Sequence, residues 1–259
     1  MLCAAQERYI TLPPEGLEGH IQGVAADETG IYWSHTTSLL KTDYEGKILA
    51  SVKVPSHAGS LCVTDGKLFV SMALRGTKIL NEHEKCRSWI FEFDSTTLEP
   101  VKKHKHPELT SPDGITFHDG KFYIAKGFPR EPHPVNEIII YDRDFKLLET
   151  RKVDIGQNTM YGAQMLAVVD GKLLAGFYGD KKKKGYFFEL NDFTNVIGTF
   201  PVRGSFGLAE LPVSVAGEKG VFIIAEVTGK RPNWGARVRV VKYESGKLTP
   251  FHKPLNTSK

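Results

Sequence analysis

Hydrophobic and polar positions alternate in short runs along most of the chain, and the runs come in pairs joined by tight turns. The clearest pair lies in residues 111–127, SPDGITFHDGKFYIAKG, where two β-prone runs flank Asp119-Gly120. An Asp-Gly dipeptide between two such runs is a strong signal for a two-residue hairpin turn. The pattern therefore predicts a β-hairpin with strands at 115–118 and 121–125.

The same hairpin pattern occurs five times. Close copies lie at residues 59–71 and 164–176, and looser copies at 23–34 and 207–225. After each hairpin the sequence predicts a third strand, a short turn and a fourth strand. A four-stranded meander that repeats about every 40 to 50 residues is typical of a propeller blade. Sustained 3.6-residue periodicity is missing, so helices are expected to be nearly absent.

The chain is therefore predicted to be all-β and to form a single five-bladed β-propeller domain. Residues 8–12 are β-prone and are expected to add a strand to the last blade, closing the ring and removing its exposed edges. The predicted blades are residues 20–54, 57–104, 111–154, 161–202 and 205–251.

The alignment of the second strands supports this register. One aligned position holds only small residues, which suits the crowded packing expected between radially arranged blades. These residues are Ser34, Ser71, Ala125, Gly176 and Ala225.

Four loops between second and third strands are long, whereas the other turns are short. Long loops on a rigid scaffold are where function usually lies. These loops hold thirteen basic and four acidic residues, a net charge of +9 against +4 for the whole chain. The charge favours an anionic ligand such as a uronic-acid glycan or a phosphate ester. The loops are residues 73–87, 126–136, 178–185 and 227–237.

The positive charge of these loops has two other interpretations. The run Lys181–Lys184 also fits a solvated hairpin tip that does no more than keep the protein soluble. A nucleic-acid partner is not expected, because aromatic residues do not alternate regularly with the basic ones.

Polar residues lead into the inner strands, at the predicted mouth of the central channel. His20 and His57 occupy the same repeat position in neighbouring blades, Asp113 aligns with Gln22, and Glu226 ends a second strand. Two imidazoles and two carboxylates suit a divalent transition metal. Without a metal, the same groups suit general acid–base catalysis. We therefore predict His20, His57, Asp113 and Glu226 as catalytic residues and as metal ligands. The alternative is that they only bind water and cap strand ends.

Further polar and aromatic residues on the same face are predicted to contact the ligand, with Trp234 exposed in a loop and able to stack on a sugar ring. The predicted ligand-binding residues are Gln22, His35, Lys126, Tyr161, Gln164, Tyr178, Lys230, Arg231 and Trp234.

The remaining features constrain the environment of the protein. Three cysteines at unrelated spacings imply no disulfide framework, and Cys62 is predicted to be a small core residue. No apolar run approaches the ~20 residues of a membrane span. Residues 1–6 resemble the end of a secretory signal, with small residues before a cleavage point after Ala5, which predicts a periplasmic or secreted protein. His104 and His106, which lie between lysines, are predicted to be solvated.

The segment Ser111-Pro112-Asp113-Gly114-Ile115, followed by Asp119-Gly120-Lys121-Phe122-Tyr123-Ile124-Ala125, resembles the blade kernel of the senescence-marker/gluconolactonase and NHL-type propellers. The resemblance implies a propeller fold for most of the chain. In the lactonase family, the equivalent position before the inner strand carries a metal-binding Asn or Asp, which corresponds to Asp113 here.

Together these observations predict an exported propeller that binds a small polar, anionic ligand, a carbohydrate or sugar acid, at the channel mouth of one basic face. One alternative is a metal-assisted hydrolase or lyase acting on such a ligand. The other is a propeller that serves as a protein-interaction platform without catalysis.

Overall fold

The protein is described here from a computed structural model. The described residues are 7–12, 17, 19–55, 57–74, 87–106, 108–109, 111–127, 133–178, 187–191, 195–200, 206–230 and 233–257.

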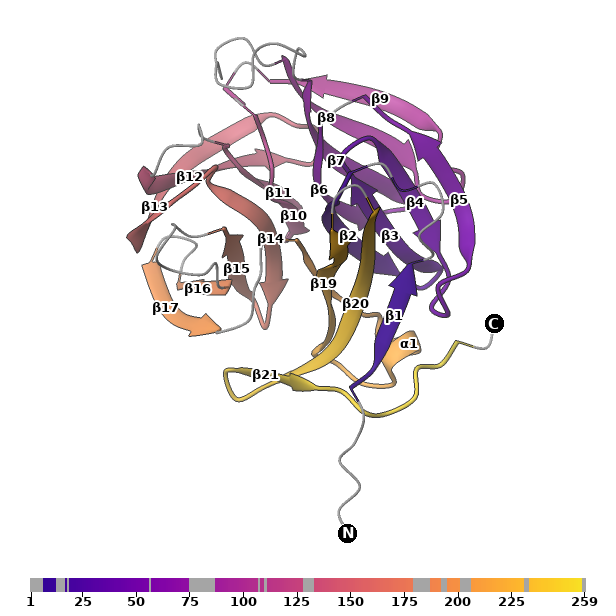
Figure 1. Ribbon diagram of the computed structural model, residues 1–259. Helices are drawn as coiled ribbons and strands as arrows, with labels where there is room; N and C mark the ends of the chain where they lie inside the picture. Colours follow the sequence, from indigo (N-terminus) through magenta and orange to yellow (C-terminus); the bar gives the residue numbers. More distant parts are fainter. Residues whose placement is uncertain are drawn as a thin grey trace.

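Five antiparallel meanders form a five-bladed β-propeller, as the sequence predicts, with inner strands such as β2, β6, β10 and β14 around the centre (Figure 1). A single parallel bridge, Asp154↔Asn195, joins the third and fourth blades. The strands of the first four blades are β2 (Ile21–Asp27), β3 (Gly30–His35), β4 (Ser38–Thr42) and β5 (Ile48–Lys53); β6 (Ala58–Thr64), β7 (Lys67–Leu74), β8 (Arg87–Asp94) and β9 (Pro100–Lys105); β10 (Ile115–His118), β11 (Lys121–Ala125), β12 (His133–Asp142) and β13 (Leu147–Thr159); β14 (Ala163–Val169), β15 (Lys172–Phe177), β16 (Phe187–Asn191) and β17 (Asn195–Phe200).

The fifth blade contains both ends of the described chain. Its first three strands, from the centre outward, are β18 (Leu208–Glu210), β19 (Val221–Lys230) and β20 (Asn233–Glu244). The outer edge of β20 is shared by β21 (Lys247–Pro250) and by the N-terminal strand β1 (Tyr9–Leu12). In Figure 1, β1 in indigo lies beside β20 in yellow. The N-terminal strand therefore closes the ring, as predicted.

The Asp-Gly turns have the backbone that the sequence demands. Both residues have positive φ angles in Asp65-Gly66, Asp119-Gly120 and Asp170-Gly171. Type I′ hairpin turns need positive φ at both central residues, and Asp-Gly is among the few pairs that tolerate it. The fifth hairpin is different, since a one-turn helix, α1 (Val213–Ala216), precedes its second strand. Among the described residues, no helix is long and apolar enough to cross a membrane.

The hydrophobic core is divided among the five junctions between blades. Each of five clusters of buried side chains joins one blade to the next, and the largest joins the fifth blade and β1 to the first. Trp33 and Phe177 are fully buried, and Cys62, the predicted core residue, is also buried. Burial of apolar surface between blades is thus what holds the ring together.

The predicted ring of small residues joins blades through hydrogen bonds as well as packing. The Ser34 hydroxyl donates to the Gly59 carbonyl of the next blade at 2.6 Å. The Ser71 hydroxyl donates to the Asp113 carbonyl of the third blade and lies 3.0 Å from the Ser60 carbonyl. Small side chains are therefore needed there because the next blade's backbone lies against them.

Glycines bring the inner strands into direct backbone contact. A Cβ on Gly23 would lie 2.8 Å from Ser60 Cα, and one on Gly114 would lie 2.9 Å from the Met165 carbonyl carbon. A Cβ on Gly207 would lie 2.8 Å from Val24 N, and real Cβ atoms do not approach that closely. A Cβ on Gly59 would lie 3.1 Å from Asp113 Oδ1, a tight but less extreme contact, so four of the five blade junctions are closely packed at this level. We call these residues the glycine collar: Gly23, Gly59, Gly114 and Gly207.

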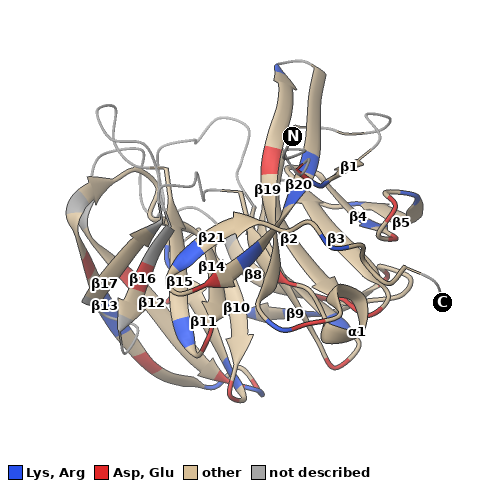
Figure 2. Cartoon of the chain, turned by 90° about the horizontal axis from the view of Figure 1, so that it is seen from below, with Lys and Arg blue, Asp and Glu red and all other residues tan. Residues whose placement is uncertain are grey.

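Two local predictions were wrong. Residues 227–237 were expected to form a loop, but β19 and β20 continue as paired strands to Lys230↔Asn233, and their hairpin stands out from the body of the propeller (Figure 2). His104 and His106 were expected to be solvated, but their side chains are only 9% and 12% exposed. His104 Nε2 lies 2.9 Å from Glu92 Oε2, and its ring stacks on Phe145 at 4.0 Å.

Candidate functional site

The mouth of the channel above the glycine collar has a polar arc on one side. Gln22, at the start of β2, lies between two histidines, with its side-chain nitrogen 2.9 Å from His20 Nδ1 and 3.4 Å from His57 Nε2. An amide nitrogen carries two hydrogens and can donate to both rings when each ring is neutral. The two histidines of neighbouring blades therefore lie close together, with the side-chain amide of Gln22 between their rings.

The polar arc continues into the third and fourth blades. The carboxylate of Asp113 accepts a hydrogen bond from Gln164 Nε2 at 3.0 Å. The Asp113 side chain also lies over the second blade, because a Cβ on Gly59 would be 3.1 Å from Asp113 Oδ1. Asp113 and Gln164 are both buried. Their backbones explain the geometry: Tyr161 and Ser111, just before the inner strands, adopt positive φ angles that turn the chain into the channel.

Aromatic rings form the other side of the mouth. The His20 ring lies 5.7 Å from the Trp234 ring and 5.9 Å from the Phe206 ring, centre to centre, in edge-to-face arrangements. Tyr178 continues the chain of contacts, 5.9 Å from Phe206 and 6.0 Å from Tyr161. Phe206 was not among the predicted ligand-binding residues. Its position just before the inner strand of the fifth blade, equivalent to that of Asp113, is the signal that could have identified it.

We call these residues together the loop-side mouth: His20, Gln22, His57, Asp113, Tyr161, Gln164, Tyr178, Phe206 and Trp234. Polar groups occupy one half of this ring and aromatic groups the other.

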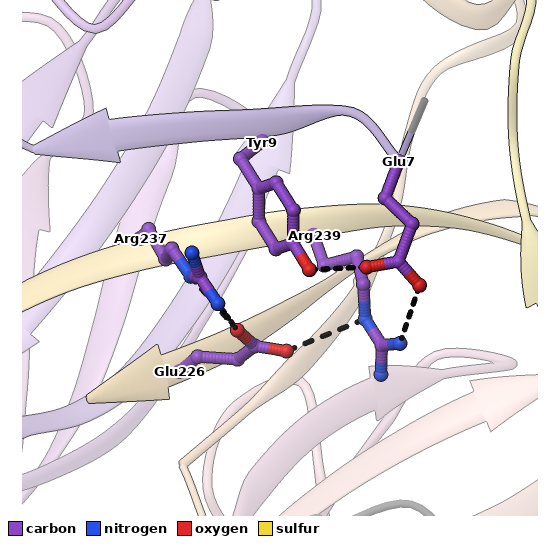
Figure 3. Close-up of polar contacts among 5 residues, drawn as sticks. All are labelled: Glu7, Tyr9, Glu226, Arg237 and Arg239. Carbon is purple, nitrogen blue, oxygen red and sulfur yellow. Dashed lines mark hydrogen bonds and ion pairs between the residues drawn. The ribbon is translucent and has the colours of Figure 1, made fainter. Parts of the chain in front are cut away.

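Glu226, predicted as a catalytic residue and metal ligand, is engaged elsewhere. Its carboxylate pairs with Arg237 at 2.9 Å and with Arg239 Nε at 3.3 Å (Figure 3). Arg237 also stacks on the Tyr9 ring at 3.9 Å, and Glu7 contacts both Tyr9 and Arg239. Glu226 therefore helps to attach the closing strand β1 to β20. The reason is cross-strand register, since Glu226 lies directly opposite Arg237.

A metal centre does not assemble at the predicted ligands. In the part of the chain that the structure describes, no three His, Cys, Asp or Glu side chains form a group able to hold a metal ion. His20 and His57 are bridged by an amide, and Glu226 is paired with two arginines. The predicted set of His20, His57, Asp113 and Glu226 is therefore not brought together as a ligand cage.

Three other predicted ligand-binding residues lie in different environments. His35 is fully buried beneath the mouth, where burial lowers its pKa to about 4 despite the hydrogen bond with the Gly19 carbonyl. Lys126 pairs with Glu137 at 2.8 Å. Lys230 is exposed at the end of β19. Arg231 and the run Lys181–Lys184 fall outside the described residues.

The described part of the predicted basic face carries little unpaired positive charge. Of the basic side chains counted on the long loops, three are described: Lys126, Lys230 and Arg237. Lys126 and Arg237 are each neutralised by a glutamate on an adjacent strand. The excess of positive charge expected from the sequence thus rests on residues that the structure does not describe.

Comparison with known proteins identifies the fold. No protein-family model matches the chain, and no curated protein sequence matches it. A protein of unknown function from Bacteroides caccae superposes with a TM-score of 0.53 at 14% identity, covering 97% of this chain and 94% of that one. The chain is a β-propeller; the comparisons do not single out the gluconolactonase or NHL branch.

Proteins named as sugar hydrolases share this fold. Sucrose-6-phosphate hydrolase from Lactobacillus gasseri gives a TM-score of 0.58 at 16% identity, over 98% of this chain and 64% of that chain. An α-L-arabinofuranosidase from Clostridium thermocellum gives 0.54 at 11% identity, over 91% and 92%. At these identities the likeness establishes the propeller fold alone.

Proposed function

We propose that the loop-side mouth binds a carbohydrate. The observation that carries the proposal is the division of the mouth into an aromatic half and a polar half. A sugar ring has an apolar C–H face that packs on aromatic rings, and hydroxyls around its edge that exchange hydrogen bonds with amides and carboxylates. A concave site with aromatic walls and a few placed polar groups is the usual design for a small-molecule ligand.

Each half has a defined role in this proposal. Trp234 and Tyr178 are half-buried and offer ring surface to the sugar, with Phe206 packed beside Tyr178. Gln22, Gln164 and Asp113 offer donors and acceptors whose orientation is fixed by the hydrogen bonds they make with one another or with the histidines. Because these groups are held before the ligand arrives, little side-chain entropy is lost on binding.

The charge of the mouth favours a neutral sugar over an acidic one. Asp113 supplies a carboxylate inside the mouth, and the nearby Lys126 and Arg237 are already paired with Glu137 and Glu226. A uronate would place its own carboxylate near Asp113, and the two like charges would repel each other. We therefore propose a neutral sugar, a change from the anionic ligand expected from composition.

Sugar hydrolases of the same fold agree with a carbohydrate ligand, but they lend it no residue-level support. Catalysis by His20, His57 and Asp113, and export of the protein, stay predictions. Binding requires neither of them.

The test is a titration of the protein with neutral sugars (glucose, galactose, fructose and arabinose) and with glucuronate and galacturonate, followed by calorimetry and tryptophan fluorescence. At least one neutral sugar should bind more tightly than its uronate. Trp234→Ala should weaken that binding by about thirtyfold, since loss of a central aromatic anchor typically costs about 2 kcal/mol or more. Asp113→Asn should restore the binding of the uronate.

A matched control is Tyr243→Phe, which alters an aromatic residue at the opposite end of the channel. This variant should bind the sugar as the wild type does. If no sugar binds, or if Trp234→Ala binds as tightly as the wild type, the mouth is not a carbohydrate site. A protein partner without sugar binding would favour the interaction-platform alternative.

A further inference from the structure

The channel has a second chamber on the opposite side of the glycine collar. A cavity of about 690 Å³ is lined by the inner strands of all five blades and by the turns that end them. Its wall begins at Val24, Ile115 and Leu208, each the residue directly after a collar glycine. The lining includes none of the residues that form the loop-side mouth, so the cavity lies at the turn side and is built from different side chains. We call it the turn-side cavity.

One level of the cavity wall is apolar in four blades and acidic in the fifth. In the first four blades this residue forms the next-to-last pair of the hairpin, so one further pair lies between it and the turn. In the fifth blade it is the last paired residue of β18. All five line the cavity, and the four apolar side chains are half-buried. The five residues are Ala26, Val63, Phe117, Val168 and Glu210.

The rim of the cavity carries more acidic than basic groups. An adjoining groove of about 620 Å³ shares Ala26, Val63, Glu210 and Lys219 with it. Five carboxylates line the two spaces against one lysine, Lys219, which leaves four negative charges. Two are engaged: Asp65 pairs with Arg143, and Asp27 accepts hydrogen bonds from Thr29 and Tyr32. The five carboxylates are Asp27, Glu28, Asp65, Asp170 and Glu210.

Glu210 is held in place at this wall. One oxygen, Oε1, accepts the backbone N–H of Gly220 at 3.1 Å. Asp170 lies on the same rim, and the other described titratable groups that line the cavity are Lys219, Tyr243, Cys62 and His118, the last 3.4 Å from Asp119. A positioned carboxylate above an apolar wall matches a ligand that has a cationic head and an apolar body.

We propose that the turn-side cavity binds a small organic cation, an ammonium group carried on a short alkyl or aryl body. The ammonium pairs with Glu210, and the body packs on Val63, Phe117 and Val168. A cavity of this volume is within the ordinary range for small-molecule sites.

The test compares three probes of equal length, hexylammonium, hexanoate and hexanol, by calorimetry on the full chain. Hexylammonium should bind at least tenfold more tightly than hexanoate. Glu210→Gln should weaken hexylammonium about tenfold and leave hexanol unchanged, because a charge-assisted hydrogen bond is lost while the Gly220 contact stays available. Glu244→Gln, which removes an exposed carboxylate from the next hairpin turn without touching the cavity wall, is the matched control and should bind as wild type.

Two further variants separate this site from the loop-side mouth. Val168→Trp should fill the cavity and abolish binding of all three probes, provided that the melting transition shows a folded protein. Trp234→Ala should leave hexylammonium binding unchanged. The proposal is overturned if hexanoate binds as tightly as hexylammonium, if no probe binds, or if Glu210→Gln binds hexylammonium like the wild type.

Discussion

The two ends of the channel are built from the same repeat but have opposite characters. At the loop-side mouth, each blade contributes a different residue at the start of its inner strand, and the result is a half-polar, half-aromatic ring. At the turn side, four blades contribute an apolar residue at one level of the cavity wall, and the fifth blade contributes Glu210 there. Chemical variety among repeats, at either end, is therefore the best guide to where a propeller binds something.

The two ends are lined by different residues, so each end can be changed separately in the following variants. Matched stability measurements, by urea or thermal unfolding, accompany each one.

The largest effect on the free energy of unfolding is expected from His35, the buried histidine beneath the mouth. Burial lowers the folded-state pKa of His35 to about 4, whereas the unfolded chain has the ordinary value near 6.5. As pH falls, the unfolded state binds the proton first, so stability present above about pH 6.5 is lost between pH 6.5 and 4. The loss attributable to His35 is on the order of 3 kcal/mol. Urea unfolding at stepped pH measures it.

His35→Gln should flatten this part of the pH dependence, while His252→Gln, at an exposed histidine, should leave it unchanged. His104 and His106 also have lowered pKa values through burial, and they add to the slope in the same direction. A wild-type slope that persists in His35→Gln would show that His35 is not the group responsible.

The collar itself is tested by Gly114→Ala. Its added Cβ would meet the Met165 carbonyl carbon at 2.9 Å, so the third and fourth blades must separate, at a cost of about 1–3 kcal/mol. Gly66→Ala is the comparison: nothing lies within 4 Å, and only its positive φ is unfavourable, at about 1 kcal/mol. Equal losses in the two variants would mean that the blades are not tightly closed at the collar.

A smaller effect is expected from the bonds between blades. Ser71→Ala removes the hydroxyl that donates to the Asp113 carbonyl, and should cost about 1–2 kcal/mol because the site is buried. It should also loosen Asp113 and weaken sugar binding more than hexylammonium binding. Ser51→Ala, on an exposed position of β5, should change neither stability nor binding.

The smallest effect concerns the closing strand. Glu226→Gln weakens the ion pairs with Arg237 and Arg239, which are partly exposed, so the loss should be below about 1 kcal/mol and should shrink in high salt. Binding at both ends of the channel should be unchanged. A large loss of sugar affinity in this variant would return Glu226 to the binding site, as the sequence alone had suggested.

The residues that sequence reasoning placed correctly share one property: their roles follow from local geometry or from the repeat. Asp119-Gly120 forms its turn because of its own backbone preferences, and Ser71 is small because every blade is crowded at that position. His20, His57, Asp113 and Gln164 reach the mouth because of their place in the repeat. Glu226 also has the repeat position expected of a mouth residue, but its carboxylate pairs with Arg237 on the adjacent strand instead.

The turn-side cavity is a feature that the sequence pattern did not predict. Glu210 stands out only when the five inner strands are aligned by their observed pairing, because the fifth hairpin carries the extra helix α1 and hides the register. His104 and His106 have polar neighbours in sequence, yet the rings of Tyr141 and Phe145 bury them. Contacts between segments distant in sequence decided these cases.

The sequence by itself determined the all-β repeat, the number of blades and the closing strand. Hairpin turns and alternating hydrophobicity are local signals, and they act within a few residues of one another. Only the tertiary structure decided which polar side chains meet in the mouth, which are neutralised by partners, and how tightly the inner strands pack at the glycine collar. Those outcomes depend on how closely neighbouring blades approach, a distance set by packing around the whole ring.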